Sequence, residues 1–285
     1  YSCGNYGDPA FAKDCLEIYS YVRECNPTVR LGIHTNGGMR NPAWWAKLAQ
    51  HNIDVAFAVD GFKGKHELYR KNTKFDKVIE NLKAFCDAGG IARVDSLVFE
   101  HNEHEVDELE SYLLSLGVQE VNFVSTTRFY EMKEFEVHDN NGNVEYTIAP
   151  AQTERFKKTP NNSLNALVDP AVRNAAVESA IIEPKCVTEK GVYIDPYGNI
   201  FPCCWIGGEY IEQPVEEKLP IHYLRNLSVD NTKTILKTVG VPNCHDAVLN
   251  TNENLFKKMP DFWQGKNKCL TCVKVCSKAL YDSRK

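Results

Sequence analysis

The sequence predicts an α/β fold in which parallel strands are joined by helices, followed by a smaller cysteine-rich domain. Over about the first 130 residues, short apolar segments alternate with longer segments of helical periodicity. Polar or glycine-rich residues follow one apolar segment after another. Beyond residue 185, six of the eleven cysteines gather in two groups far apart along the chain. The first two observations predict a parallel sheet with helical crossovers, and the third predicts a separate sulfur-rich unit.

Each predicted strand is a largely apolar run, and a helix of about four turns or fewer follows it. The strands are predicted at residues 30–34, 54–59, 92–99 and 120–124, after a first strand that ends at residues 1–3. The helices are predicted at residues 9–24, around 44–49, 74–88 and 106–116. In the helix at 74–88, apolar residues such as Phe75, Val78 and Leu82 recur at helical spacing and define its buried face.

Polar residues occur where these strands end. In a parallel sheet the carboxyl ends of the strands share one edge, and ligands bind there. We therefore expect the residues after the strands to converge on one site. They are Gly7-Asp8-Pro9, Thr35-Asn36-Gly37, Asp60-Gly61, Glu100-His101-Asn102 and Thr126-Thr127-Arg128.

Charge and composition exclude several classes of protein. The 285 residues carry a net charge of −5, whereas a dedicated nucleic-acid binder presents a basic face. The lysines within 257–258 and 266–268 are predicted to be solvated surface. No apolar run approaches the ~18 residues of a membrane span, and no signal peptide opens the chain. The odd number of cysteines favours reduced thiols, and hence a cytoplasmic protein.

The region after the predicted sheet divides the chain. An alternating pattern at residues 134–148, interrupted by Asn140-Asn141-Gly142-Asn143, predicts an exposed hairpin. We predict a first domain at residues 1–150, a linker at 151–183 and a cysteine-rich domain at 184–285. A helix is expected near residues 228–239 of the second domain.

The first cysteine group flanks a second predicted hairpin. A strand at Val192–Ile194, a turn at Asp195–Asn199 and a returning strand separate Cys186 from Cys203. Proline and glycine in the turn favour its geometry, so the hairpin brings its two ends together. The second group lies far downstream, within residues 269–276.

Two local groups of thiols separated by a long gap indicate a zinc or iron–sulfur site, and sulfur ligation alone does not choose between the two. The candidate ligands are Cys186, Cys203, Cys204, Cys269, Cys272 and Cys276. Cys15, Cys25 and Cys86 fall in helical patterns and are predicted to be small buried hydrophobic residues.

The cysteine-rich part resembles the SPASM/twitch auxiliary-cluster domain of radical S-adenosylmethionine (radical SAM) enzymes. Cys186, eleven residues, Gly198, four residues and Cys203 match its opening motif, and Cys269-Leu-Thr-Cys272 matches its later Cys-x-x-Cys. The chain lacks the further cysteines of the full SPASM form. The resemblance therefore implies the twitch form, in which four cysteines hold one auxiliary [4Fe–4S] cluster. These are Cys186, Cys203, Cys269 and Cys272, with Cys204 or Cys276 as alternative ligands.

The first part resembles the radical SAM partial (β/α) barrel from its second strand onward. Gly7-Asp8-Pro9 stands where the family has Gly-Glu-Pro, which implies that Gly7, Asp8 and Pro9 hold the methionine amino group of S-adenosylmethionine. Thr35-Asn36 and Asp60 match positions that approach the methionine and the ribose. Asn102 is similar to a residue near ribose and adenine, and Arg128 falls where some members bind a carboxylate.

One departure from the family concerns its defining Cys-x-x-x-Cys-x-x-Cys. In the family this motif lies on the loop after the first strand, which would precede residue 1, and none of the 285 residues form a copy. We expect the chain to be a fragment of an enzyme whose first strand and loop lie outside it; the alternative is a natural truncation. The radical-generating [4Fe–4S] cluster is expected only if that segment exists.

The resemblance implies an enzyme that uses a 5′-deoxyadenosyl radical to abstract a substrate hydrogen, in peptide or protein modification or in small-molecule oxidation. It implies an electron donor such as flavodoxin or ferredoxin, and an auxiliary cluster that transfers electrons or supports the structure. No residue is predicted as a catalytic acid or base; His34, Tyr69 and Glu100 lie near the predicted site. The alternative is a non-catalytic zinc or iron–sulfur module, or a truncated, inactive homologue.

Overall fold

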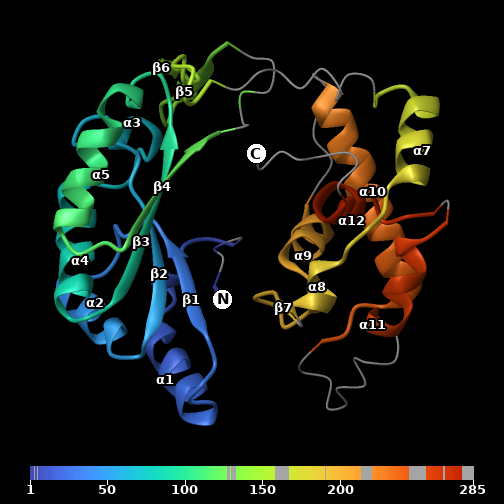
Figure 1. The fold of residues 1–285 in the computed structure, drawn as a ribbon, viewed down its shortest axis with the longest axis horizontal. Helices are drawn as coiled ribbons and strands as arrows, with labels where there is room; N and C mark the ends of the chain where they lie inside the picture. Colours follow the sequence, from blue (N-terminus) through green and yellow to red (C-terminus); the bar gives the residue numbers. More distant parts are fainter. Residues whose placement is uncertain are drawn as a thin grey trace. The chain divides into compact units, whose positions relative to one another are not determined.

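The computed structural model describes residues 1–2, 4, 6–126, 129, 133–157, 167–189, 191–212, 220–243, 255–265 and 267–277. The chain divides into two compact units, Tyr1–Pro160 and Asn161–Lys285, which we describe separately. The division falls within the predicted linker (Figure 1).

The first unit is built on a four-stranded sheet in which every neighbouring pair is parallel. The predicted α/β fold class is confirmed. Ser2 adds a parallel bridge to Ile33 beside the first strand, as expected for the end of a preceding strand. In the order β1-β2-β3-β4, the strands are Leu31–Thr35, Ile53–Ala58, Ile91–Val98 and Glu120–Ser125.

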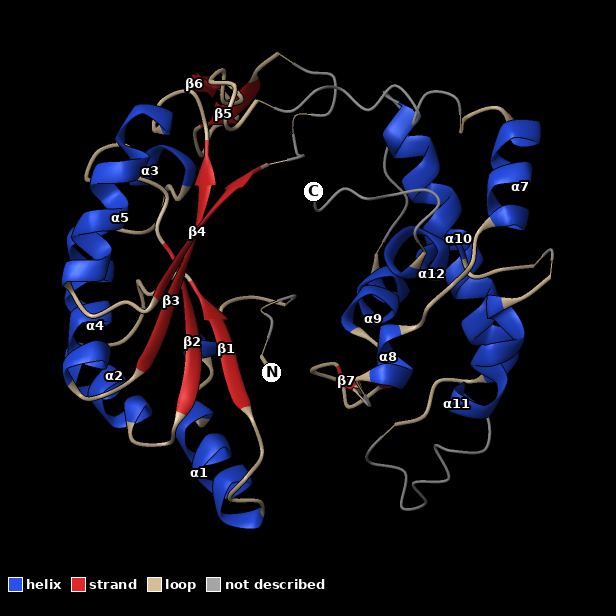
Figure 2. Cartoon of the chain, in the orientation of Figure 1, coloured by secondary structure: helices blue, strands red, loops and turns tan. Residues whose placement is uncertain are grey.

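Helices connect these strands, and α2, α4 and α5 lie against one face of the sheet (Figure 2). The helices are α1 (Cys15–Cys25), α2 (Pro42–Ala49), α3 (His66–Tyr69), α4 (Phe75–Asp87) and α5 (Val106–Ser115), with 3-10 turns η1 (Pro9–Phe11) and η2 (Glu103–Glu105). The single helix predicted at residues 9–24 is wrong in its first turns. Pro9 begins a 3-10 turn, and the extended backbone of Ala12 ends it before α1 starts.

Aromatic side chains form the centre of the packing between helices and sheet. Trp45 of α2, Phe57 of β2 and Phe85 of α4 are fully buried, and their ring centroids lie 5.0–6.4 Å apart. Val78 and Leu82 of α4 are buried beside them, as the helical periodicity predicts. Burial of each such side chain contributes roughly 1.5–3 kcal/mol.

The opposite face of the sheet carries polar residues that the sequence analysis does not single out. Along β3, Ala92 and Val94 are buried while the alternating residues Arg93, Asp95 and Leu97 are half-buried. This alternation is typical of a strand with one face on an apolar core. Within the first unit, the described helices thus leave a partly polar face of the sheet uncovered.

The hairpin predicted at residues 134–148 is present. Strands β5 (Phe135–His138) and β6 (Val144–Ile148) are antiparallel, with a register shift between Val137 and His138. The chain that follows stays with the first unit, because Ala151 and Phe156 pack against Val98 and Val106.

The second unit is mainly helical around a short hairpin. It contains α7 (Pro170–Ser179), α8 (Lys185–Thr188), β7 (Tyr193–Ile194), β8 (Ile200–Phe201), α9 (Cys204–Ile211), α10 (Pro220–Val239), α11 (Leu255–Lys258), η4 (Met259–Trp263) and α12 (Leu270–Cys276). The Asp195 carboxylate closes the predicted turn by accepting hydrogen bonds from the backbone N–H groups of Tyr197 and Asn199, both at 2.9 Å. Gly198 takes a left-handed φ of 80°, which glycine adopts without strain.

Two predictions about surface and core are wrong. Lys268 is buried, and its Nζ donates to the carbonyl oxygens of Val177, Glu178 and Ala180 at 2.7–3.0 Å. The ammonium group satisfies carbonyls at the end of α7 and complements the helix dipole there. Cys25 is exposed, because it occupies the last position of α1, beyond the buried stripe of that helix.

Among the described helices, none combines the length and apolar character needed to cross a bilayer.

We expect Phe85→Ala to lower the free energy of unfolding of the first unit by about 3–5 kcal/mol, because it leaves a cavity between Trp45 and Phe57. Urea denaturation followed by tryptophan fluorescence measures this loss. Phe11→Ala is the matched control, since Phe11 is 70% exposed and Phe85 is 0% exposed. Equal losses in the two variants would contradict this description of the core.

Candidate functional site

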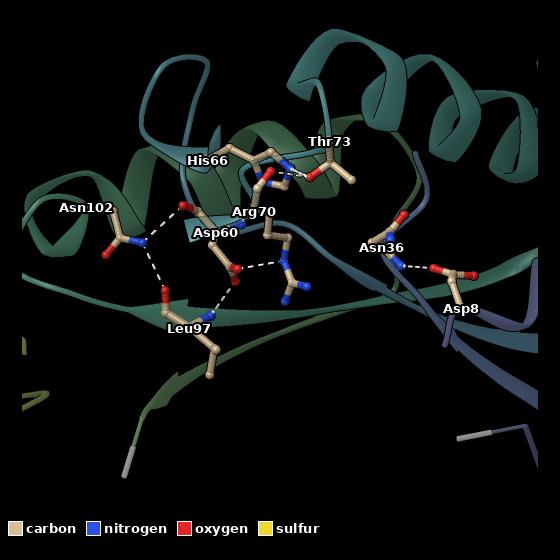
Figure 3. A network of polar contacts seen from close by, with 8 residues as sticks. All are labelled: Asp8, Asn36, Asp60, His66, Arg70, Thr73, Leu97 and Asn102. Carbon is tan, nitrogen blue, oxygen red and sulfur yellow. Dashed lines mark hydrogen bonds and ion pairs between the residues drawn. The ribbon is translucent and has the colours of Figure 1, made fainter. Parts of the chain in front are cut away.

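The loop at residues 7–9 is tied to the carboxyl end of β1 through one carboxylate. Asp8 caps η1 by accepting a hydrogen bond from the Ala10 N–H at 3.0 Å. The same carboxylate accepts from the Thr35 hydroxyl at 2.9 Å. It also accepts from the Asn36 N–H at 2.7 Å, as Figure 3 shows. The structure thus brings together Asp8, Thr35 and Asn36, which the sequence analysis assigns to one site.

The conformation of this loop explains its residue types. Gly7 has a φ of 122°, a left-handed value that L side chains avoid. Pro9 occupies the first position of η1, where its missing N–H is not needed. Asn36 accepts a hydrogen bond from the Gly38 N–H through its side-chain oxygen at 2.9 Å and so shapes the turn after β1. The contact of these residues with S-adenosylmethionine stays a prediction.

Asp60, at the end of β2, is fully buried and paired. One carboxylate oxygen lies 2.6 Å from Nε of Arg70, and the other accepts from the Leu97 N–H at 2.7 Å (Figure 3). A buried charge without a partner is costly, so the Asp60 carboxylate requires the Arg70 guanidinium beside it at this position.

Asn102 joins the same edge through its amide group. Its Nδ2 donates to the backbone oxygens of Asp60 at 3.1 Å and Leu97 at 2.9 Å, and its oxygen accepts from the Phe99 N–H at 2.7 Å. Asn102 is buried. The side chains of Asp60 and Asn102 thus hold the ends of β2 and β3 together, and their predicted approach to S-adenosylmethionine stays a prediction.

His66 belongs to this network although nothing in the sequence analysis singles it out. Its Nδ1 accepts from the Asp60 N–H at 3.1 Å, so the proton lies on Nε2, 3.3 Å from the Thr73 hydroxyl (Figure 3). Burial lowers the pKa of His66 to about 4, and the nearby Arg70 charge acts in the same direction. The imidazole is therefore neutral at physiological pH.

A second polar group lies on the uncovered face of the sheet; we call Tyr1, His34, Arg93, Asp95 and Asn122 the open-face cluster. Arg93 donates from Nη2 to the Tyr1 hydroxyl and to Nε2 of His34, both at 2.9 Å. Asp95 lies 3.7 Å from Nε of Arg93 and accepts from the Asn122 amide at 3.2 Å. Burial lowers the pKa of His34, which therefore accepts from Arg93 as a neutral ring.

The open-face cluster offers donors and acceptors of both charges on a half-exposed surface. The sequence analysis noted His34 and missed Arg93, Asp95 and Asn122, because it looked for site residues only at the ends of the strands. The charged residues at alternating positions 93 and 95 are the signal that could have located this face. Arg128, the remaining predicted residue of the first unit, lies outside the described residues.

In the second unit, two of the predicted thiols lie at helix N-termini. Cys203 is the N-cap residue of α9. Cys269 is the N-cap residue of α12. The positive end of the helix dipole favours the thiolate form, which is the form that ligates metals.

The thiols also act on one another. The interaction between Cys269 and Cys272 lowers the pKa of Cys269 and raises that of Cys272. Burial raises the pKa of Cys203 to about 11, with smaller contributions from Cys186 and Cys276. Burial likewise raises the pKa of Cys186. Five of the six predicted thiols are therefore linked by their electrostatic interactions.

The donor set fits a sulfur-ligated metal group in its chemistry, because thiols are the ligands that zinc and iron–sulfur sites use. Cys204, the first residue of α9, is half-buried. Within the described residues, no three or more Cys, His, Asp or Glu side chains lie close enough together to hold a metal ion. The assignment of the ligands stays a prediction.

No protein-family model matches the chain, and a search of curated proteins finds no match. Among solved structures, the chain is similar to Streptococcus suis SuiB bound to precursor peptide SuiA, with 12% identity and a TM-score of 0.44 over 77% of this chain and 52% of that chain. It is also similar to a histidine-tagged anSMEcpe with bound AdoMet, with 13% identity and a TM-score of 0.44 over 80% of this chain and 65% of that chain. The chain thus spans about half of the SuiB chain and less than two thirds of that anSMEcpe chain.

The neutral, buried state of His66 predicts that the first unit loses stability in acid. The unfolded chain binds a proton at histidine with a pKa of about 6.5, whereas the folded His66 stays neutral down to about pH 4. Stability is therefore present above pH 6.5 and falls as the pH drops to 4, by up to about 3 kcal/mol.

Urea denaturation at a series of pH values measures this loss. We expect His66→Gln to reduce the pH dependence between 6.5 and 4, whereas His104→Gln, at an exposed position, retains it in full. Burial also lowers the pKa of His34 and of His101, and these two residues account for part of the remaining dependence. An unchanged slope in His66→Gln would show that another group is responsible.

Proposed function

We propose that this chain is part of a radical SAM enzyme that abstracts a hydrogen atom from a peptide or small-molecule substrate. The observation that supports this most is the junction of the 7–9 loop with Thr35 and Asn36, made by the Asp8 carboxylate at the carboxyl edge of a parallel sheet. Loops at this edge are where such sheets bind ligands. In an enzyme of this class, S-adenosylmethionine bound to a reduced iron–sulfur cluster supplies the 5′-deoxyadenosyl radical.

In the proposed function, the residues of this chain bind and orient S-adenosylmethionine. The 7–9 loop offers backbone groups to the methionine end of S-adenosylmethionine, and Asp8 keeps the loop against β1. Asp60, Arg70 and Asn102 give the neighbouring loops one fixed geometry, and Asp60 and Asn102 would lie near the ribose of the ligand. Such pre-organisation lowers the entropic cost of binding.

The open-face cluster is our candidate surface for the substrate. Arg93 and His34 present hydrogen-bond donors, and Asp95 presents an acceptor, on the side of the sheet that the described helices of the first unit leave uncovered. Peptide groups and polar small molecules both carry the complementary donors and acceptors. No residue of the cluster is assigned as an acid or base.

We propose further that the second unit holds an auxiliary [4Fe–4S] cluster on Cys186, Cys203, Cys269 and Cys272, with Cys204 or Cys276 as alternatives. The thiols at helix N-termini support this assignment, since the positive end of a helix dipole favours the thiolate form that ligates iron. The group would transfer electrons or support the fold, and a flavodoxin- or ferredoxin-type protein would deliver electrons. The reaction would be an oxidoreductase or peptide-modifying reaction.

A structural zinc module is the rival function. It is favoured by the burial of Cys269 and Cys272 in the apolar cluster of the second unit, beside Phe201, Leu236 and Met259. Closed sites in a small core are typical of structural zinc.

Metal content separates these functions. After anaerobic reconstitution, the proposed function predicts about four iron and four sulfide per chain, whereas the rival predicts about one zinc and no iron. We expect Cys272→Ala to lose the iron and its visible absorption, whereas Cys25→Ala, an exposed thiol outside the site, keeps both. Full iron content in Cys272→Ala would contradict the ligand assignment.

Asp8→Ala is expected to weaken S-adenosylmethionine binding about tenfold, because the loop loses hydrogen bonds worth about 1–3 kcal/mol. Titration of the intact enzyme, with every segment present, measures the affinity. Asp14→Ala is the matched control, since Asp14 is exposed and its side chain caps no backbone N–H. Equal affinity for Asp8→Ala and wild type would remove the 7–9 loop from the proposed site.

A further inference from the structure

The second unit contains a buried carboxylate that connects helices carrying the predicted thiol ligands. Glu209 of α9 is only 8% exposed. It accepts hydrogen bonds from the Ser228 hydroxyl at 2.9 Å, from the Thr232 hydroxyl at 2.8 Å and from the Thr271 hydroxyl. A buried carboxylate requires such partners, because its desolvation is costly.

The composition of this group indicates the charge state of Glu209. Ser228, Thr232 and Thr271 are all buried, and each hydroxyl can donate one proton to the carboxylate. Thr271 also lies 3.0 Å from the Ser228 hydroxyl and 2.9 Å from the Thr232 hydroxyl. Several donors around one acceptor suit an ionised carboxylate, and these partners carry no charge of their own.

The hydrogen-bond network of Glu209 connects the helices that carry the two groups of predicted thiol ligands. Glu209 lies on the helix that begins after Cys203, and Thr271 lies between Cys269 and Cys272 on α12. The two N-terminal thiol positions are therefore held by helices that share one buried hydrogen-bond network. Glu209 belongs to none of the motifs described in the sequence analysis.

The Glu209 carboxylate is also connected directly to the segment that carries two predicted ligands. It accepts a hydrogen bond from the Thr271 hydroxyl, and Thr271 directly precedes Cys272 in α12. This places the carboxylate within electrostatic range of a predicted ligand. Charges interact strongly over such distances in a poorly solvated interior.

We propose that Glu209 is a positioning residue that sets the spacing of the two thiol groups and, through its negative charge, lowers the reduction potential of the iron–sulfur group they hold. This inference rests on the proposed function of the second unit. Reduction adds negative charge to such a group, so a nearby carboxylate favours the oxidised form, and net charge is one of the factors that set these potentials. An iron–sulfur group with a low reduction potential transfers an electron to an acceptor rather than retaining it.

The test compares Glu209→Gln with wild type in the full reconstituted chain. Glutamine keeps the shape of glutamate and removes its charge. At a fixed potential, we expect the ratio of oxidised to reduced iron–sulfur group to fall at least tenfold in Glu209→Gln. This change corresponds to a rise of about 59 mV in the reduction potential for one electron. A redox titration followed by electron paramagnetic resonance measures this. Glu212→Gln is the matched control, because Glu212 is half-exposed and pairs with Arg225 outside the network.

An unchanged potential in Glu209→Gln, at full iron content, overturns the proposal. If that variant does not fold, Thr232→Val replaces it, since it keeps the carboxylate and removes one donor. We then expect iron to be lost to a chelator several-fold faster than from wild type, and an equal rate overturns the proposal.

Failure of the proposed function has a different signature. If wild type takes up zinc and no iron, the iron–sulfur function fails. The positioning role is then tested by the rate of zinc release, which we expect to be several-fold faster in Glu209→Gln than in wild type or Glu212→Gln. Equal rates in the three proteins would refute the positioning role.

Discussion

The arrangement of the first unit depends on a buried charge. Asp60 is a fully buried carboxylate, and it meets the Arg70 guanidinium on one oxygen and the Leu97 N–H on the other. Removing one partner of a buried ion pair costs about 3–5 kcal/mol, so this pair strongly restricts the loops around it. Asn102 extends the restriction to the end of β3. The polar residues at the carboxyl edge therefore have positions that are set before any ligand arrives.

The second unit also contains a buried carboxylate with polar partners, and these partners are hydroxyl groups rather than a guanidinium. Glu209 lies among buried hydroxyls and joins helices that carry the predicted thiol ligands. In both units a buried carboxylate and its partners supply rigidity to elements that carry residues we propose to bind a ligand.

The parts of the site that could be predicted are those with local signals. Turn residues located the hairpin after Cys186, strand periodicity located the carboxyl edge, and a short motif located Asp8 beside Thr35. Lys268 shows the limit, because a lysine in a polar stretch was expected in solvent and instead binds three carbonyls at the end of α7. That environment comes from residues about 90 positions away, which no local pattern records.

By itself, the sequence determined the parallel α/β class, the order of strands and helices, and the presence of a thiol-rich second unit, because backbone periodicity and turn chemistry act over a few residues. Only the tertiary structure decided which face of β3 is open, that Asp60 is paired with Arg70, and that Glu209 connects two thiol-bearing helices. The physical reason is that burial and charge pairing depend on neighbours in space. A carboxylate in solvent and a carboxylate in the core have the same letter in a sequence, and they differ only in what surrounds them.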